Sequence, residues 1–150
     1  MKKRILLADD DDSVRKMVAR VLESAGYQVL QAATGREAVA QFRDGQPHLV
    51  LLDLKMPDQD GWRAFEEVNQ QNCQVPVIVI TAWPNQNEAA ARRGIDALME
   101  KPLDLPLLLQ TIGNLLEEPR QKRTERLSGR QKATSYLSPS ASLAFRSEAA

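Results

Sequence analysis

Near the start of the chain stands the stretch Ile5-Leu6-Leu7-Ala8-Asp9-Asp10-Asp11-Asp12, which passes from apolar to acidic in one step. The apolar half is typical of a strand that is buried on both faces of a parallel sheet. The four carboxylates repel one another unless a cation or another positive group neutralises them. Mg²⁺ would suit such a group because it prefers oxygen ligands and keeps several waters. An acidic surface turn that caps the next helix would explain the same four residues, so the choice depends on the rest of the chain.

Strand-like and helix-like segments alternate five times along the chain. The segments with strand character are Ile5–Ala8, Tyr27–Ala32, His48–Leu52, Val75–Ile80 and Ala97–Met99. A segment with helical spacing or a helix-capping signal follows each one, at 14–26, 34–42, 62–68, 85–94 and 105–118. Five βα units in succession require a parallel sheet with right-handed crossovers. The predicted fold is therefore α/β, a doubly wound (βα)5 flavodoxin-like sheet with strand order 2-1-3-4-5.

Charge divides the chain into two parts. Residues 1–118 carry 13 Lys and Arg against 18 Asp and Glu, a net charge of −5, whereas residues 119–150 carry 7 against 2, a net charge of +5. Beyond Pro119 the composition turns to Ser, Arg, Lys, Ala and Gln without sustained periodicity. We therefore expect one folded domain at 1–118 and a disordered basic tail at 119–150.

Composition also limits where the protein works. A single cysteine, Cys73, excludes an intrachain disulfide and makes no metal site, which suits a reducing cytosol. No apolar stretch approaches the ~20 residues of a membrane-spanning helix. The basic Lys2-Lys3-Arg4 precedes only a short apolar run that ends in acids, so it is not a secretory signal. We expect a cytoplasmic protein without a membrane partner.

Polar residues follow four of the five predicted strands. Asp9 and Asp10 come after the first strand, Asp53 after the third, Thr81 after the fourth and Lys101 after the fifth. In a doubly wound sheet the functional crevice lies at the carboxyl ends of the strands. Each residue has an ordinary explanation by itself, as a turn residue, strand filler or solvated charge. Their shared position at one sheet edge instead predicts a single site.

Over residues 3–118 the chain resembles the receiver domain of bacterial two-component response regulators, in particular the single-domain receivers of chemotaxis. The resemblance rests on four blocks in this order: ILLADDD at 5–11, LLDLKMPDQDG at 51–61, VIVITA at 77–82 and EKP at 100–102. The Asp pair or the Lys-Pro pair alone would be weak, whereas the four blocks together are highly specific.

The resemblance implies a role for each site residue. Asp53 would be the nucleophile that accepts a phosphoryl group from the phosphohistidine of a histidine kinase or a histidine phosphotransfer protein. Asp9, Asp10 and Asp53, with the backbone carbonyl of Lys55, would hold Mg²⁺ or Mn²⁺. The phosphoryl oxygens would meet the side chains of Thr81 and Lys101 and the backbone amide of Ala82. The domain would catalyse only its own phosphorylation and slow autodephosphorylation, and would not be an enzyme for other substrates.

Two positions bear on switching and access. Many receivers have an aromatic residue three places before the lysine, where this chain has Leu98, so switching should depend more on backbone and loop movement. Trp83 is predicted to cover the phosphorylation site or to face a partner.

The last helix, at 105–118, has more leucines than one core-facing stripe needs. The excess suggests a homodimer or partner surface on the face formed by the fourth helix, fifth strand and fifth helix, although burial on two sides would also explain it.

Three functions compete. The first is a receiver that passes its phosphorylation state to a downstream protein through a Mg-dependent conformational change. The alternative is the receiver fragment of a transcription factor whose DNA-binding module is missing, because the 32-residue tail has no helix-turn-helix pattern and supports no specific nucleic-acid binding. The third is a phosphohydrolase of the haloacid dehalogenase type. It is disfavoured because Lys55 stands where those enzymes have a second Asp.

Overall fold

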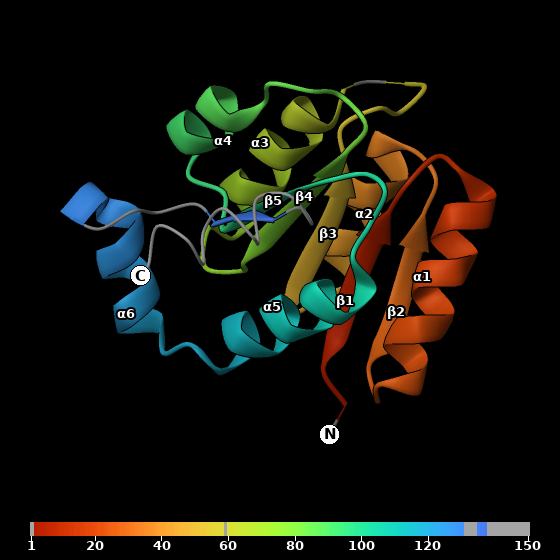
Figure 1. Ribbon diagram of the computed structural model, residues 1–150, viewed down its shortest axis with the longest axis horizontal. Helices are drawn as coiled ribbons and strands as arrows, with labels where there is room; N and C mark the ends of the chain where they lie inside the picture. Colours follow the sequence, from red (N-terminus) through yellow and green to blue (C-terminus); the bar gives the residue numbers. More distant parts are fainter. Residues whose placement is uncertain (1, 59, 131–134, 138–150) are drawn as a thin grey trace. The chain divides into compact units, whose positions relative to one another are not determined.

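The computed structural model describes residues 2–58, 60–130 and 135–137 (Figure 1). The strands are β1 (Arg4–Ala8), β2 (Gln28–Ala32), β3 (Leu49–Asp53), β4 (Val77–Thr81), β5 (Ala97–Glu100) and β6 (Ser135–Leu137). The helices are α1 (Asp12–Ser24), α2 (Gly35–Gly45), α3 (Gly61–Gln71), α4 (Asn87–Arg93), α5 (Leu105–Glu117), α6 (Arg120–Glu125) and the π-helical turn η1 (Arg126–Arg130). The strand order is β2-β1-β3-β4-β5-β6. This confirms the predicted 2-1-3-4-5 order and adds β6, which the sequence did not predict.

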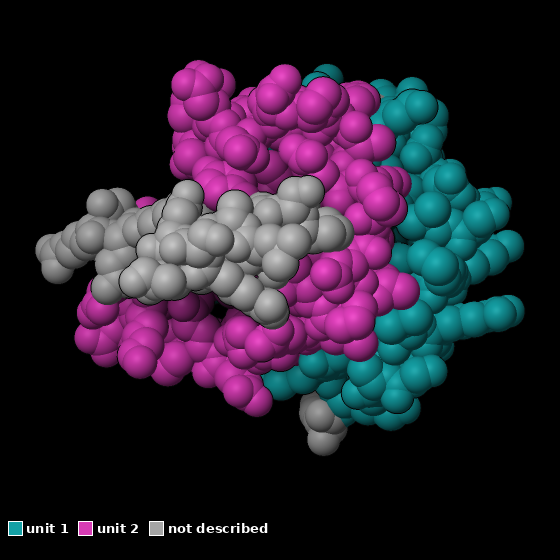
Figure 2. All heavy atoms as spheres, viewed as in Figure 1, with its two compact units in different colours: residues 1–78 teal, residues 79–150 magenta. Residues whose placement is uncertain are grey.

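The chain forms two compact units, residues 1–78 and 79–150 (Figure 2). In the first unit, β1 pairs in parallel with β2 and with β3, so that Ile5 lies opposite both Val29 and Leu49. Every residue of β3 and all of β1 after Arg4 are buried. Burial of successive residues means that both faces of these strands are covered, as their continuous apolar sequences predict. The helix α1 packs against β1 and β2, whereas α2 packs against β1, β2 and α3.

Side-chain caps define where the helices of the first unit begin. The carboxylate of Asp11 accepts a hydrogen bond from the Val14 amide at the start of α1, and Asp60 accepts one from Arg63 at the start of α3. Thr34 accepts a hydrogen bond from the Glu37 amide, as the capping pattern predicts. The Glu37 carboxylate, however, reaches back to the amide of Ala33 at 2.7 Å, one residue before the cap. The helices α1 and α3, which follow β1 and β3, therefore both begin at a hydrogen bond to a carboxylate of the preceding loop.

The second unit contains α4, β5, α5 and the C-terminal elements. Gly94 ends α4 in the left-handed conformation, with φ at 72°, as the sequence predicts. Asp104 caps α5 by accepting a hydrogen bond from the Leu107 amide. Only Leu108 and Ile112 of α5 are fully buried, and its other large apolar residues are partly exposed. The expected second apolar stripe of this helix therefore has partial access to solvent within its unit.

The C-terminal tail departs from the expectation of disorder in its first part. Residues 120–130 form α6 and η1, and β6 follows at 135–137. The remaining tail residues, 131–134 and 138–150, lie outside the described residues, so the expectation of disorder there stays a prediction. The sequence offered no hydrophobic pattern from which to predict this helix, because α6 has no buried residue of its own. Arg123 instead bonds to Asp96, which precedes it by 27 positions and lies just before β5.

None of the helices in the described part of the chain combines the length and the apolar character needed to cross a membrane.

Candidate functional site

Three carboxylates of the first unit gather at the ends of β1 and β3. Asp9, Asp10 and Asp53 each offer an oxygen that lies within 4.8 Å of the oxygens of the other two. Asp9 is fully buried, and Asp53 is only 2% exposed. Burying carboxylates side by side is unfavourable unless positive charge compensates them. The prediction that the residues after these two strands meet at one edge is confirmed.

Asp9 is held by its own loop. One of its carboxylate oxygens accepts a hydrogen bond from the Asp11 amide at 3.0 Å, and its backbone amide donates to the carbonyl of Ala32. The guanidinium of Arg15 donates to the backbone carbonyl of Asp9 at 2.8 Å and to the carboxylate of Asp12 at 2.5 Å. The hydrogen bond and the charge of Arg15 lower the pKa of Asp12. Arg15 thus ties the first turn of α1 to the acidic loop, a role that the sequence did not reveal.

Asp53 ends β3, and its carboxylate accepts a hydrogen bond from the backbone amide of Lys55 at 3.2 Å. Behind it, the Gly61 amide donates to the carbonyl of Leu54 at 2.7 Å. A Cβ atom at Gly61 would collide with the Asp53 carbonyl oxygen and lie 2.6 Å from the Cα of Leu54. The first residue of α3 therefore has to be glycine for the chain to follow this path. The available signal was a glycine directly before the predicted helical segment at 62–68.

The donor set of the acidic cluster fits a hard divalent cation. Carboxylate oxygens are the ligands that Mg²⁺ and Mn²⁺ prefer, and a cation between three of them removes their mutual repulsion. Backbone amides from Asp11 and Lys55 already orient two of the carboxylates. Such outer contacts fix the direction of a metal ligand before the ion arrives. The arrangement therefore suggests Mg²⁺ binding.

The remaining predicted residues lie in the second unit. The backbone amide of Lys101 donates to the carbonyl of Thr81 at 2.8 Å, so the ends of β4 and β5 are joined at these two positions. Thr81 is fully buried, and its hydroxyl oxygen accepts a hydrogen bond from the Trp83 amide at 2.9 Å. A hydroxyl that accepts one hydrogen bond keeps its proton for another acceptor. The geometry leaves Thr81 able to donate.

The positions predicted to control switching differ in exposure. Leu98 is buried in β5, whereas Trp83 is 37% exposed and Ala82 is exposed beside it. The peptide bond between Lys101 and Pro102 is cis. The predicted site residues thus form two groups, Asp9, Asp10, Asp53 and Lys55 in the first unit and Thr81, Ala82, Trp83, Leu98 and Lys101 in the second.

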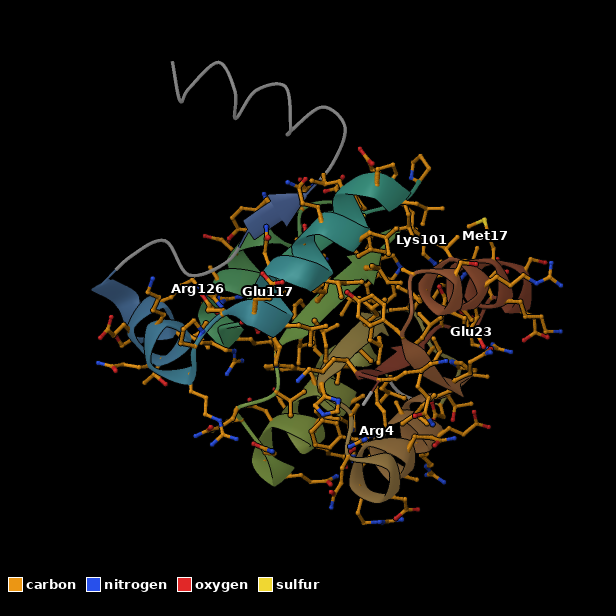
Figure 3. All side chains as sticks on the ribbon, turned by 90° about the horizontal axis from the view of Figure 1, so that it is seen from below. Arg4, Met17, Glu23, Lys101, Glu117 and Arg126 are labelled. Carbon is orange, nitrogen blue, oxygen red and sulfur yellow. The ribbon has the colours of Figure 1, made fainter. Side chains whose placement is uncertain are left out.

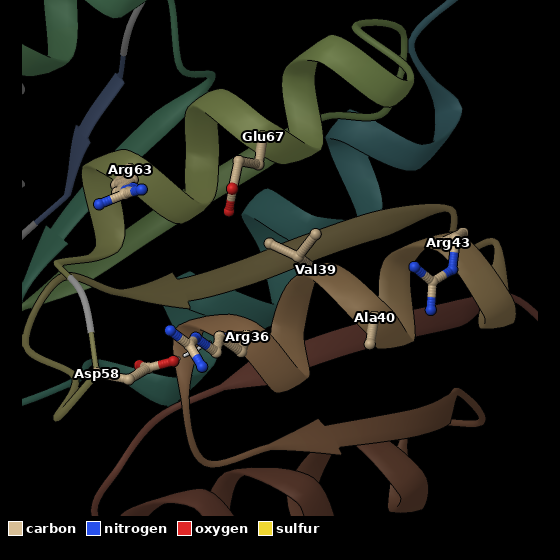
Figure 4. Close-up of a pocket in the computed structure, with 7 residues that line it drawn as sticks. All are labelled: Arg36, Val39, Ala40, Arg43, Asp58, Arg63 and Glu67. Atoms are coloured by element: carbon tan, nitrogen blue, oxygen red, sulfur yellow. Dashed lines mark hydrogen bonds between the residues drawn. The ribbon is translucent and has the colours of Figure 1, made fainter.

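A shallow cavity of about 330 Å³ lies between α2 and α3 in the first unit (Figure 4). Its lining consists of Arg36, Val39, Ala40, Arg43, Asp58, Arg63 and Glu67. The carboxylate of Asp58 accepts hydrogen bonds from the amides of Gly35 and Arg36 at 2.8 and 2.9 Å, which adds a distant cap to α2. No predicted site residue lines this cavity. Asp58 therefore joins the loop after β3 to α2 and is not a fourth member of the acidic cluster.

Residues 5–113 match the family model of the response regulator receiver domain. The chain belongs to this family. The receiver has the strand order that the succession of βα units predicted, and the family is a signalling family of two-component systems.

Two curated relatives differ in length from the receiver. Regulatory protein AtoC of Escherichia coli is 33% identical over 135 residues, which cover 89% of this chain but 29% of AtoC. Protein PilH of Pseudomonas aeruginosa is 32% identical over 117 residues, which cover 75% of this chain and 97% of PilH. The chain thus spans less than a third of one relative and nearly all of the other.

Solved structures support the same assignment. A CheY-like response regulator receiver domain protein from Methanospirillum hungatei superimposes with a TM-score of 0.76 and 31% identity, covering 81% of this chain and 98% of that one. The response regulator TrrA from Thermotoga maritima, solved in complex with Mg²⁺–BeF, gives a TM-score of 0.70 and 27% identity over 75% of this chain and 98% of TrrA. Each of these two solved chains is therefore matched over nearly its full length.

Proposed function

We propose that this receiver accepts a phosphoryl group on Asp53 from a histidine kinase or a histidine phosphotransfer protein, and signals to a protein partner. The observation that carries the proposal is the clustering of Asp53 with Asp9 and Asp10 within 4.8 Å. A carboxylate nucleophile forms an acyl phosphate when positive charge compensates the phosphoryl oxygens. The other two carboxylates recruit that charge.

Mg²⁺ is the cation we propose for the cluster, held by Asp9, Asp10, Asp53 and the backbone carbonyl of Lys55. Support comes from the all-oxygen donor set and from TrrA, whose structure contains Mg²⁺–BeF. When bound, the ion would neutralise negative charge on the transferred group. Asp9 would stay oriented by the Asp11 amide throughout, because that hydrogen bond uses a single oxygen of its carboxylate.

Thr81, Ala82 and Lys101 are the groups that we propose to contact the phosphoryl oxygens. The hydroxyl of Thr81 retains a proton to donate, and the ammonium of Lys101 supplies a positive charge. The hydrogen bond from Lys101 to the Thr81 carbonyl supports a joint response, because a shift of one strand end is transmitted to the other. A change of this kind would alter the surface that includes α4, β5 and α5, where we place the downstream partner or a second copy of the chain.

A second assignment is favoured by the lengths of the relatives. Because the chain matches only 29% of AtoC, it would also suit the receiver part of a longer transcriptional regulator. PilH, which is matched over 97% of its length, favours the stand-alone role. The two assignments share the phosphorylation chemistry and differ only in what receives the signal.

Incubation of the protein with Mg²⁺ and acetyl phosphate, followed by mass spectrometry, tests the phosphorylation. We expect one added phosphoryl group on Asp53, with no addition in Asp53→Asn or after removal of Mg²⁺ by EDTA. Asp44→Asn serves as a matched control, because Asp44 is an exposed acid on α2 outside the cluster. Phosphorylation of another residue, or equal incorporation without divalent metal, would contradict the proposal.

Trp83 is proposed to slow hydrolysis of the acyl phosphate by limiting the access of water. Its exposed side chain follows Thr81 by two residues, and its amide is already bonded to the Thr81 hydroxyl. The variant Trp83→Ala should lose its phosphoryl group several-fold faster than the parent, measured as the decay of phosphorylated protein after removal of the donor. An unchanged lifetime would instead leave Trp83 as a partner-facing residue.

A further inference from the structure

A buried and paired charge of the second unit, Asp96, lies outside the predicted site. Asp96, just before β5, is 1% exposed. Its carboxylate accepts two hydrogen bonds from Arg123, at 2.9 and 3.0 Å, and one from Arg126 at 2.6 Å. Arg126 also donates to both carboxylate oxygens of Glu118, at 3.1 and 2.8 Å. Two guanidinium groups from the C-terminal segment thus meet two carboxylates of the domain body.

This geometry is specific as well as close. A two-point contact between a guanidinium and a carboxylate fixes orientation in addition to attraction. The arginine side chains are only 12% and 16% exposed, so the ion pairs are largely shielded from water. Burial by itself lowers the pKa of Arg126, but the hydrogen bonds to Glu118 and Asp96 outweigh it and raise that pKa. Figure 3 shows Arg126 next to the C-terminal end of α5.

The same C-terminal segment covers the edge of β5. The strand β6 pairs in parallel with β5, with Ala97 opposite Ser135, Leu98 opposite Tyr136 and Met99 opposite Leu137. The hydroxyl of Tyr136 donates to the backbone carbonyl of Asn87, the first residue of α4, at 3.1 Å. An uncovered edge strand offers a row of backbone donors and acceptors to other chains. In this structure β6 of the same chain pairs with this edge of β5.

We propose that the edge of β5, together with Asp96, is a docking surface for an extended arginine-bearing segment, and that this chain carries its own occupant. The occupant, here called the clasp, consists of Arg120–Arg130 and Ser135–Leu137. Charge supports the assignment, because residues 119–150 carry a net +5 and residues 1–118 a net −5. A protein that binds by adding a strand to β5 has to displace the clasp first. The inference does not depend on phosphorylation of Asp53.

Hydrogen exchange on the full-length protein tests whether the clasp shields β5. The double variant Arg123→Gln/Arg126→Gln removes the guanidinium contacts, and Arg120→Gln/Lys122→Gln removes the same charge from two exposed positions of α6. We expect the amides of β5 to exchange at least about tenfold faster in the first variant, because hydrogen bonds to charged groups are lost, and to change little in the second. Equal exchange in the two variants, or an equal rise in β1, would overturn local shielding.

A milder variant guards against loss of the whole fold. Tyr136→Phe keeps the ring and removes only the hydroxyl that bonds to Asn87. It should speed exchange of the β5 amides a few-fold and leave β1 unchanged. No change in β5 would show that β6 does not hold this edge closed.

A synthetic peptide of residues 119–150, added in trans, tests whether the surface accepts an occupant. The peptide should bind Arg123→Gln/Arg126→Gln, whose own clasp is released, and should not bind the parent, because an intramolecular segment has a high effective concentration. Adding Asp96→Asn to the double variant should abolish binding. If the peptide does not bind the opened protein, the edge of β5 is not a docking surface, and the clasp only stabilises the fold. A dimer of the parent in which the clasp of one copy pairs with β5 of the other would also overturn the proposal, since the clasp would then occupy a second copy.

Discussion

Buried carboxylates occur in both units of the molecule, and their surroundings differ. In the second unit, Asp96 is met by the side chains of Arg123 and Arg126. In the first unit, Asp9 and Asp53 accept hydrogen bonds from backbone amides and lie beside a further carboxylate, Asp10. Backbone amides orient a carboxylate without cancelling its charge.

The difference separates an ion pair that joins two segments of the chain from a cluster of like charges that a cation can stabilise. An internal ion pair has its compensation within the chain, so it holds two segments together and needs nothing from solution. A cluster of like charges gains stability when a cation binds to the folded state, and the stability of its unit therefore responds to that cation. Substitutions in each unit can test this contrast, and they are ordered here from the largest expected effect to the smallest.

Removal of the carboxylate of Asp96 should have the largest effect on stability. Asp96→Ala leaves two largely buried guanidinium groups without this partner, and loss of one member of a buried ion pair costs about 3–5 kcal/mol. Urea denaturation followed by circular dichroism would measure the change. Asp44→Ala, which removes an exposed acid paired with Arg43, should give no resolvable change. Similar stabilities for the two variants would make the Asp96 pair dispensable.

Mg²⁺ should stabilise the first unit's cluster through binding to the folded state. At a concentration one hundred times the dissociation constant, the free energy of unfolding should rise by about 2.7 kcal/mol. Asp9→Asn should lose most of this response. Asp12→Asn, which removes an acid of the same run outside the cluster, should keep it. Thermal denaturation with and without Mg²⁺ measures both, and an equal response in the two variants would remove Asp9 from the site.

The close approach of Gly61 to the end of β3 gives a steric test of the same site. Gly61→Ala places a Cβ against the backbone of Asp53 and Leu54, and overpacking of this kind costs about 1–3 kcal/mol. In contrast, a Cβ added at Gly113 in α5 would meet no atom within 4 Å, so Gly113→Ala should stabilise the protein by about 0.5–1 kcal/mol. Opposite signs in chemical denaturation are expected. If both substitutions changed the free energy of unfolding in the same direction, the loop after β3 would have moved to accommodate the added Cβ atom.

The smallest expected effect on stability comes from His48, the single histidine of the chain. Its imidazole is partly buried and neutral. Burial, followed by the charges of Arg4 and Lys3, lowers its pKa below the ordinary value of 6.5. Its Nδ1 accepts a hydrogen bond from the Arg4 amide at 2.9 Å, which requires the unprotonated nitrogen. The unfolded chain binds a proton more readily, so the stability from His48 is complete above pH 6.5 and declines as the pH falls through the folded pKa.

The free energy of unfolding should therefore drop slightly between pH 7.5 and pH 5.5. His48→Asn keeps an acceptor but has no group that titrates in this range, so its stability should be nearly independent of pH there. Urea denaturation at the two pH values measures the difference. An equal pH dependence in parent and variant would assign the effect to other groups.

Much of the fold, and the meeting of the three carboxylates in the first unit, follow from the local sequence pattern. Period and strand-end position correctly predicted that Asp9, Asp10 and Asp53 would meet, because parallel strands end at a common edge. Element boundaries were less accurate, and the fourth strand runs over Val77–Thr81 and not over Val75–Ile80. Pro76 lacks an amide donor, which accounts for a strand that begins after it.

The features that escaped prediction are pairings between distant residues. Asp58 caps α2 from 23 positions away, Gly61 touches the strand end before it, and Arg126 reaches Asp96 across 30 positions. None of these contacts repeats with a period, so hydrophobic patterning carries no signal for them. In the C-terminal segment, polar composition predicted disorder even though ion pairs order its first residues.

Local sequence thus specified the alternation of strands and helices and the order of acids at the strand ends, because side-chain periodicity and parallel pairing act over a few residues. Tertiary structure decided which charges from distant parts of the chain meet as ion pairs, as Asp96 does with Arg123 and Arg126, and which gather as like charges, as Asp9, Asp10 and Asp53 do. That choice depends on the separation of charged atoms in space and on their exclusion from water, and neither quantity is written in the spacing of residues along the chain.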